Sequence, residues 1–244
     1  MRTLYFVYGI LCYVAALAVF GYLAGFLLEM GVPRSVSAPD AGFTSTAILV
    51  DVGLLLLFAL QHSIMARPTF KSAWMRIVPE PIERSTYVLF SCLALGVLFW
   101  LWQPIGNVVW QAGSGSVQAG LYGLYGIGWA IVLAATFLLN HFDLFGLRQV
   151  WLQFRERPYS RLTFATPVFY RIVRHPLYVG WLLVFWAAPV MTMGRLIFAV
   201  GQTIYILVAI KLEERNLLEI HGQDYAEYRR RVPMLVPGLK RATG

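Results

Sequence analysis

The chain has 244 residues, of which 59% are hydrophobic and only 13% are charged, and its mean hydropathy is +0.64. This composition excludes a soluble globular domain, whose surface needs more charge, and indicates an integral membrane protein. The net charge of +8 does not require a nucleic-acid partner, because membrane topology and anionic lipid headgroups account for it.

Six apolar runs predict membrane-spanning helices, because each approaches the length that crosses a bilayer and carries few or no charges. In chain order the runs cover residues 4–28, 46–65, 85–102, 121–139, 177–193 and 196–212. The last two runs are the shortest, and only Gly194 and Arg195 separate them. We therefore expect the last two helices to form a hairpin.

Beyond the last run, apolar residues recur among acidic ones from 213 to 228. This pattern predicts a further helix that turns at Gly222 and stops before Pro233. The predicted fold is an all-α integral membrane protein with five to six transmembrane helices, the last two forming a hairpin, plus a cytoplasmic C-terminal helix. We expect 1–244 to form a single membrane domain, with a four-helix part at 1–139 and a cofactor-binding loop, hairpin and tail at 140–244.

The basic residues predict how the chain is oriented in the membrane. With six spans, 18 of the 20 Lys and Arg residues fall on one side, and only Arg34 and Arg195 fall on the other. Because positively charged loops stay in the cytoplasm, both termini are expected there.

Glycine and cysteine, which often mark cofactor or metal sites, indicate packing in this chain. The fourth run and the residue before it contain four glycines between 120 and 128, but they lack the G-x-G-x-x-G order and no strand is expected before them. Close contact between helices explains them better than a nucleotide-binding loop. Cys12 and Cys92 lie inside apolar runs, so we expect neither a disulfide nor a metal site.

The cytoplasmic start of the fifth run combines polar and aromatic residues. Pro176 suits the first position of a helix and places His175 near its cap, where free amide groups can accept an anion. Arg174 and His175 add hydrogen-bond donors, and Tyr178 adds an aromatic face. The cluster is either a ligand site or an interfacial anchor of the kind common at helix ends.

Glu213 and Glu214 follow the sixth run directly, where neither the positive-inside rule nor the negative end of a helix favours acidic residues. They therefore need partners. A structural partner would be Arg174 or Arg215, and a functional partner would be a hydroxyl or amino group of a ligand.

His62 lies near the inner end of the second run, where an ionisable group is costly and is a functional candidate by default. It could equally be a hydrogen-bonding residue between helices. Polar residues of the neighbouring runs are expected at the same depth, and they include Arg67, Glu83, Arg84, Asn140 and His141. This convergence of polar residues at one depth is stronger evidence for a functional site than any single residue is.

Several of these motifs resemble those of known membrane enzymes. The sequences R-H-P-L-Y-V-G at 174–180, E-E-R-N-L-L at 213–218 and G-Q-D-Y-A-E-Y at 222–228 resemble the C-terminal core of isoprenylcysteine carboxyl methyltransferases and phospholipid methyltransferases, which use S-adenosylmethionine. The sequences Q-H-S-I-M-A-R at 61–67, I-E-R-S-T-Y-V-L at 82–89 and N-H-F-D-L-F-G-L-R-Q-V-W at 140–151 resemble the nurim and NnrU-like group. Within that group the likeness is to the methanethiol S-methyltransferases, which make dimethyl sulfide.

The resemblance implies a multi-pass protein of the bacterial inner membrane that transfers a methyl group from S-adenosylmethionine to a small volatile thiol. Its implied partners are this thiol and the lipid bilayer, with no nucleic acid, no metal and no obligate protein partner. The alternatives are a methyltransferase acting on an isoprenylcysteine or a lipid, and a non-enzymatic nurim-like membrane protein.

The resemblance also implies roles for individual residues. The residues expected to bind the cofactor or line its entry are Tyr170, Arg171, Arg174, His175, Pro176, Tyr178, Gly180, Glu213 and Glu214. Those expected to shape the substrate end are Arg67, Glu83, Arg84 and Asn140. A small thiol is weakly acidic, so a group that stabilises its thiolate would raise the rate, and His62 or His141 is expected to be that group.

Overall fold

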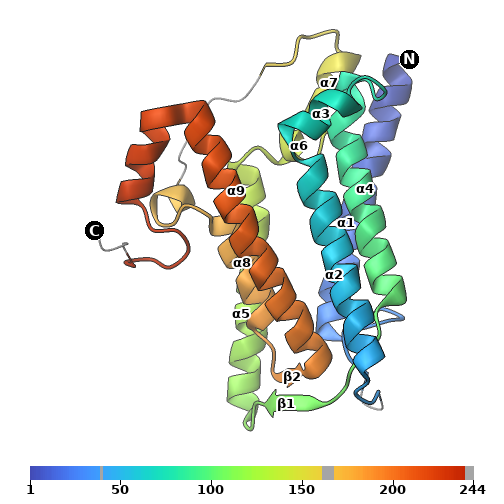
Figure 1. Cartoon of the computed structure of the whole chain (residues 1–244), viewed down its shortest axis with the longest axis vertical. Helices are drawn as coiled ribbons and strands as arrows, with labels where there is room; N and C mark the ends of the chain where they lie inside the picture. The colour runs from blue at the N-terminus through green and yellow to red at the C-terminus, as the bar shows by residue number, and fades with distance from the viewer. Residues whose placement is uncertain (39–40, 161–167, 240–244) are drawn as a thin grey trace. The chain divides into compact units, whose positions relative to one another are not determined.

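The structure is a computed structural model that describes residues 1–38, 41–160 and 168–239. Its elements in chain order are α1 (Arg2–Leu28), α2 (Ser45–Met65), α3 (Pro68–Trp74), α4 (Glu80–Leu101), β1 (Val108–Gln111), α5 (Gly115–Leu138), α6 (His141–Leu144), α7 (Leu147–Phe154), the 3-10 helix η1 (Val168–Arg171), α8 (Pro176–Trp186), β2 (Val190–Thr192) and α9 (Met193–Arg231). Of these, α1, α2, α4, α5 and α9 are long and apolar enough to cross a membrane (Figure 1). The prediction of an all-α membrane protein is therefore confirmed.

The fifth apolar run differs from the predicted full span. Helix α8 has only 11 residues, which corresponds to about 16 Å, roughly half of the hydrocarbon thickness. Pro189 explains the early end, because a proline removes a helical hydrogen bond and disfavours helical geometry in the residue before it. The last part of the run then forms strand β2.

Helix α9 continues well past the apolar run that predicted it and includes the expected C-terminal helix. Gly222 interrupts it with a backbone φ of 52° and ψ of −122°, a conformation that favours glycine. Figure 1 shows the helix turning back on itself in this region. The predicted turn at Gly222 and the predicted end before Pro233 are both confirmed.

The chain forms two compact units whose segments alternate along the sequence. Unit 1 consists of Met1–Gln111, Asn140–Arg161 and Val190–Gly201, and unit 2 consists of Ala112–Leu139, Leu162–Pro189 and Gln202–Gly244. The expected division between 1–139 and 140–244 stays a prediction.

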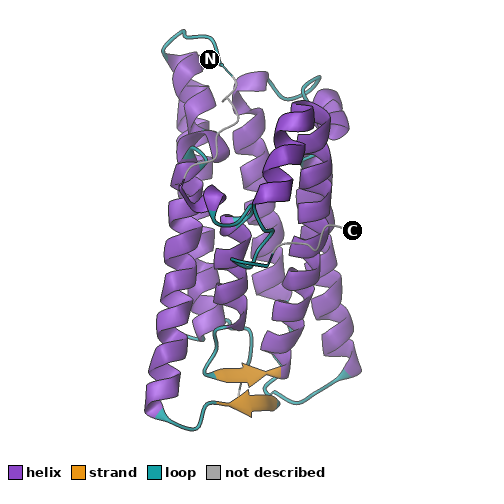
Figure 2. Cartoon of the chain, turned by 90° about the vertical axis from the view of Figure 1, so that its left-hand side faces the viewer, coloured by secondary structure: helices purple, strands orange, loops and turns teal. Residues whose placement is uncertain are grey.

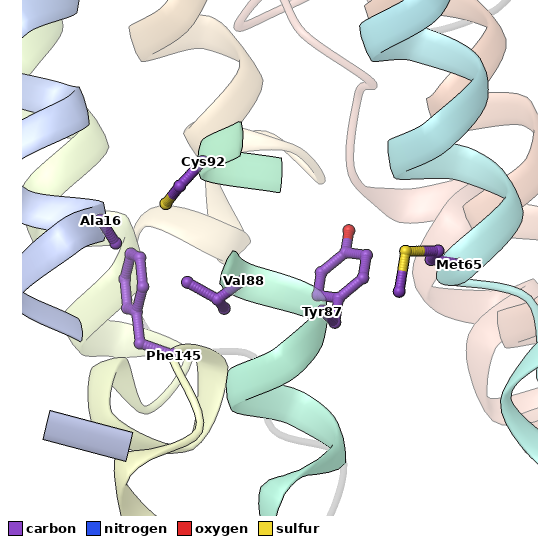
Figure 3. Packing of buried hydrophobic residues seen from close by; sticks show 6 residues of the cluster. All are labelled: Ala16, Met65, Tyr87, Val88, Cys92 and Phe145. Carbon is purple, nitrogen blue, oxygen red and sulfur yellow. The ribbon is translucent and has the colours of Figure 1, made fainter. Parts of the chain in front are cut away.

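Unit 1 is built around α4, which packs against both α1 and α2. Its buried apolar cluster consists of Ala16, Met65, Tyr87, Val88, Cys92 and Phe145 (Figure 3). Gly146 links α6 to α7 with a φ of 87°, and a Cβ atom there would lie only 2.7 Å from the Ser85 backbone nitrogen. This close approach places α6 and α7 against the start of α4.

The other end of unit 1 is closed by the short sheet in Figure 2, in which β1 and β2 run antiparallel. Val108 lies opposite Thr192, and Trp110 lies opposite Met191. Asp51 of α2 accepts a hydrogen bond from the Gln103 backbone at 2.8 Å, just after α4 ends. These contacts connect the ends of the long helices away from α6 and α7.

Unit 2 depends on close packing of α5 against α8. A Cβ atom on Gly128 would lie 2.9 Å from the Gly180 carbonyl oxygen, and one on Gly180 would lie 2.8 Å from the Gly128 carbonyl oxygen. The prediction of glycine-mediated packing therefore holds at Gly128. Gly120, Gly123 and Gly126 instead face open space.

Candidate functional site

The first candidate cluster lies in unit 2, where α8 begins. Pro176 occupies the first turn of α8 and His175 is its N-cap residue, as the sequence predicts. The side chains of both Arg174 and His175 reach Glu214 of α9. Arg174 donates from Nε to Glu214 Oε1 at 2.7 Å, and His175 Nε2 lies 3.0 Å from the same oxygen. Glu214 thus has Arg174 as a structural partner, and a role toward a ligand stays a prediction.

Glu213 and Glu214 occupy different environments. The side chain of Glu214 is 11% exposed, whereas that of Glu213 is 47% exposed. Glu213 Oε2 accepts a hydrogen bond from the Tyr178 hydroxyl at 3.1 Å and lies 3.9 Å from His175 Nδ1. Glu214 is thus enclosed by its partners, while Glu213 presents a carboxylate that hydroxyl or ammonium groups of a ligand can reach.

The C-terminal tail is fastened to the same cluster through Arg174. Its Nη1 donates to the Val232 carbonyl at 2.5 Å and to the Arg229 carbonyl at 3.1 Å. Its backbone N–H donates to the Pro233 carbonyl at 2.9 Å, and the His175 N–H donates to Met234 at 3.2 Å. Arg174 therefore holds Glu214 and the tail in place at the same time, a role that the flat, many-donor guanidinium suits.

Tyr170 and Arg171 lie in η1, before this cluster. The Tyr170 carbonyl accepts a hydrogen bond from the Tyr228 hydroxyl at 2.6 Å. Burial, followed by the nearby negative charge of Glu213, raises the pKa of Tyr170, so its phenol keeps its proton at neutral pH. Arg171 is exposed, and Gly180 is enclosed in the contact between α5 and α8. The structure thus brings together Tyr170, Arg174, His175, Tyr178, Glu213 and Glu214.

The second cluster lies in unit 1 and centres on His62. Its Nε2 lies 2.8 Å from the Tyr87 hydroxyl, and its Nδ1 lies 3.0 Å from the Ser91 hydroxyl. The guanidinium of Arg84 sits over the Tyr87 ring, 4.9 Å from its centre, and its Nε donates to the Leu144 carbonyl at 2.8 Å. His62 therefore links α2 to α4 by hydrogen bonds, and its functional role stays a prediction.

The other predicted residues of unit 1 have structural partners. Glu83 is buried and pairs with Lys71 Nζ at 2.9 Å. Asn140 caps α6 by accepting the Asp143 N–H at 3.2 Å. Arg67 lies at the N-cap of α3. The Lys71–Glu83 pair joins α3 to the start of α4.

His141 forms a second histidine–tyrosine contact in unit 1. Its Nε2 lies 2.9 Å from the Tyr13 hydroxyl of α1, and its ring is buried beside Phe145. Burial lowers the pKa of His141, so the neutral imidazole is favoured.

Sequence reasoning missed Tyr87, Ser91 and the tail as parts of these clusters. Tyr87 could have been found, because it lies near the start of a predicted helix, three residues after Arg84, which shares its face if the helix begins one turn earlier. The contacts of the tail could not have been predicted, because they depend on the direction that the chain takes after the turn at Gly222. Within the described ranges, no group of three or more His, Cys, Asp or Glu residues is placed to hold a metal ion.

Comparison with known proteins identifies several relatives. A family model described as "Protein of unknown function (DUF1295)" matches residues 70–232. A methanethiol S-methyltransferase of Crocosphaera subtropica is 55% identical over 97% of this chain and 92% of its own length. One of Mycobacterium tuberculosis is 47% identical over 99% of both chains. Nurim of Sus scrofa is 32% identical over 82% of this chain and 81% of its own. No solved structure matches the chain.

Proposed function

Because the chain belongs to the DUF1295 family and to the family of the methanethiol S-methyltransferases, we propose that it methylates methanethiol to dimethyl sulfide. The observation that carries this proposal is the 55% identity to a protein of that name over 97% of the chain. Such a likeness covers both polar clusters as well as the membrane helices.

S-adenosylmethionine is the proposed methyl donor, and it would supply a methyl group activated by a positively charged sulfonium. The cluster at the start of α8 suits such a ligand. Arg174 already neutralises Glu214 and His175 hydrogen-bonds to it, so the exposed carboxylate of Glu213 is left to attract a cation or to accept hydrogen bonds from ribose hydroxyls. Tyr178 and His175 would orient that carboxylate.

The remaining residues receive supporting roles in the same proposal. Tyr170 and Arg171 would line the entry of the donor, Arg174 would hold the tail and Glu214, and Pro176 and Gly180 would set the start and packing of α8. The acceptor side is assigned to His62, Arg67, Glu83, Arg84, Asn140 and His141. The positive charge of Arg84 favours a thiolate over a thiol, which supports this assignment.

The five apolar helices indicate an integral membrane protein by their length and composition. We propose a bacterial inner-membrane location with both termini in the cytoplasm. The strong bias of Lys and Arg toward one side supports this orientation. An apolar thiol can dissolve in the bilayer, whereas a charged donor would come from the cytoplasm.

The direct test is to supply the purified protein with S-adenosylmethionine and methanethiol and to measure dimethyl sulfide in the headspace. Calorimetry with the donor alone measures binding separately. We expect Glu213→Gln to weaken donor binding at least tenfold with little change in thermal stability. Glu219→Gln is a matched control, because Glu219 lies at the exposed surface, where it pairs with Arg215.

Each outcome of this test decides between the alternatives. Dimethyl sulfide release supports the proposal. A methylated, extractable lipid without dimethyl sulfide would indicate a lipid or isoprenylcysteine acceptor. Neither product and no binding heat would contradict an enzymatic function and favour a nurim-like membrane protein.

A further inference from the structure

One face of α4 carries an apolar groove of about 340 Å³. Its lining residues are Cys92, Leu93, Gly96, Val97, Trp100 and Leu101. From Leu93 onward they follow the spacing of three and four residues that places side chains in one stripe along a helix. Leu93 is 55% exposed and Trp100 is 68% exposed, so the stripe faces away from the core of unit 1. On a helix that crosses a membrane, such a face meets lipid.

Gly96 leaves the gap in this stripe. Leu93 and Trp100 lie three residues before it and four residues after it, so they are its neighbours on the helix surface. A Cβ atom on Gly96 would meet nothing within 4 Å among the described residues beyond its own helical backbone. Packing within the chain therefore does not require glycine here, although glycine costs a helix about 1 kcal/mol relative to alanine. A group that fills the gap comes from outside the chain.

The groove has the length of one acyl chain in a bilayer leaflet. From Cys92 to Leu101 the helix rises about 14 Å, at about 1.5 Å per residue. One leaflet contributes about 15 Å to the hydrocarbon core. Because α4 ends at Leu101, the groove extends from near the middle of the membrane to one of its edges.

A cation lies at the end of the groove where α4 ends. The guanidinium of Arg34 sits over the Trp100 ring, 5.1 Å from its centre. Tyr22 of α1 connects Arg34 to α4, because its hydroxyl donates to the Arg34 carbonyl at 3.4 Å and its ring stacks on Phe99 at 4.8 Å. A guanidinium that lies on a ring keeps its N–H groups at its edge, so the exposed Arg34 side chain can also donate to a phosphate.

We propose that this groove binds one anionic phospholipid, with an acyl chain along Leu93, Gly96 and Val97 and the phosphate on Arg34. A guanidinium binds a phosphate through two parallel hydrogen bonds, and tryptophan is enriched at the headgroup level, where Trp100 then lies. An anionic lipid carries no ammonium group to oppose the charge of Arg34. The inference rests on the membrane location of α4 and is independent of the proposed enzymatic activity.

A second copy of the chain suits the groove less well. Two copies that packed symmetrically through this face would each present the same residues to the other. Their Arg34 side chains would then lie at the same depth on the two sides of the contact, where like charges repel.

The test locates the lipid by photo-crosslinking to the full-length protein in detergent. The probe is phosphatidylglycerol with a diazirine group in its acyl chain, and phosphatidylcholine with the same chain is the comparison without net charge. Mass spectrometry of the peptides should find the phosphatidylglycerol label on residues 92–101. Hydrogen bonds to a charged group are worth about 1.5–3 kcal/mol, so we expect a preference of about tenfold or more over phosphatidylcholine.

Two variants with matched controls assign this preference to the groove. Arg34→Gln should remove the preference, whereas Arg155→Gln should keep it, although Arg155 also lies over a tryptophan ring, 5.6 Å from the centre of Trp151. Gly96→Leu should reduce labelling of α4 by both probes about tenfold or more, because its side chain fills the gap. Gly53→Leu should leave labelling unchanged, because Gly53 has the same open surroundings on α2 and lies outside the groove. Equal melting temperatures in lipid-free detergent would show that the variants fold.

Three results would overturn the proposal. The first is equal labelling of α4 by both probes in the parent protein. The second is labelling that Gly96→Leu leaves unchanged. The third is a parent protein that forms oligomers without added lipid, as measured by light scattering, and that Gly96→Leu converts to monomers, because the groove would then be a contact between copies. None of these results depends on methyl transfer, so they leave the proposed function untouched.

Discussion

Arg174 Nε and His175 Nε2 both contact a single oxygen of Glu214, at 2.7 and 3.0 Å, although Glu214 lies about forty residues further along the chain. This shared oxygen joins the start of α8 to α9 and leaves the adjacent Glu213 with Tyr178 as its hydrogen-bond donor. We therefore expect substitution of Glu214 to affect mainly stability and substitution of Glu213 to affect mainly ligand binding.

Glu214→Gln should destabilise the protein, whereas Glu213→Gln should not. Removing the charge of Glu214 leaves Arg174 and His175 without their shared partner in a largely enclosed position, which we expect to cost about 2–4 kcal/mol. Thermal unfolding in detergent measures the difference. Equal melting temperatures for the two variants would contradict the separate roles of the two carboxylates.

The contact between α5 and α8 predicts opposite effects for two glycine substitutions. Gly128→Ala places a methyl group 2.9 Å from the Gly180 carbonyl and the Val184 nitrogen, so the helices must move apart at a cost of about 1–3 kcal/mol. Gly123→Ala adds its methyl group in open space and should stabilise α5 by up to about 1 kcal/mol, because alanine favours helix. Thermal unfolding of both variants checks the order, and a Gly128→Ala protein as stable as the parent would rule out the close contact.

The turn at Gly222 should be sensitive to any side chain. Its φ of 52° with ψ of −122° is costly for alanine, by about 1–3 kcal/mol. Gly222→Ala should therefore loosen the tail that Arg174 holds and weaken binding of S-adenosylmethionine. Limited proteolysis should cleave the tail of the variant faster than that of the parent. Gly120→Ala, at a site with open space, serves as the control and should leave both measurements unchanged.

The lowered pKa of buried His141 predicts that the protein loses stability in mild acid. Burial lowers its pKa in the folded state, so below the unfolded value of about 6.5 the unfolded chain binds the proton more readily. The contribution of neutral His141 to the free energy of unfolding is fully present above that pH. Below it, this contribution falls by up to about 1.4 kcal/mol per pH unit, until the pH reaches the pKa of the folded state. Melting temperatures at pH 7.5 and 5.5 should differ more in the parent than in His141→Gln. His221→Gln is the control and should show the same difference in melting temperature as the parent. If His141→Gln also shows the parent's difference, another group is responsible.

Much of the membrane architecture and part of the site could be predicted from local patterns. Apolar length alone located four of the spans and the start of the last one, because a helix in lipid needs about twenty apolar residues. Pro176 located the start of α8, and Gly222 located the turn in α9, because both residues restrict the backbone wherever they occur. The length of the fifth apolar run predicted a full span wrongly, because run length does not take into account that Pro189 ends α8 early.

The sequence by itself determined that this is a membrane protein, which polar residues follow or precede its apolar runs and which family it resembles. Only the tertiary structure decided that Glu214 is enclosed while Glu213 is open, because neighbouring residues on a helix face directions about 100° apart and only packing selects between them. It also decided that Gly128 packs while Gly123 does not, and that His62 bonds Tyr87. These are contacts between segments distant in the chain, and no local pattern encodes which face of one helix meets which face of another.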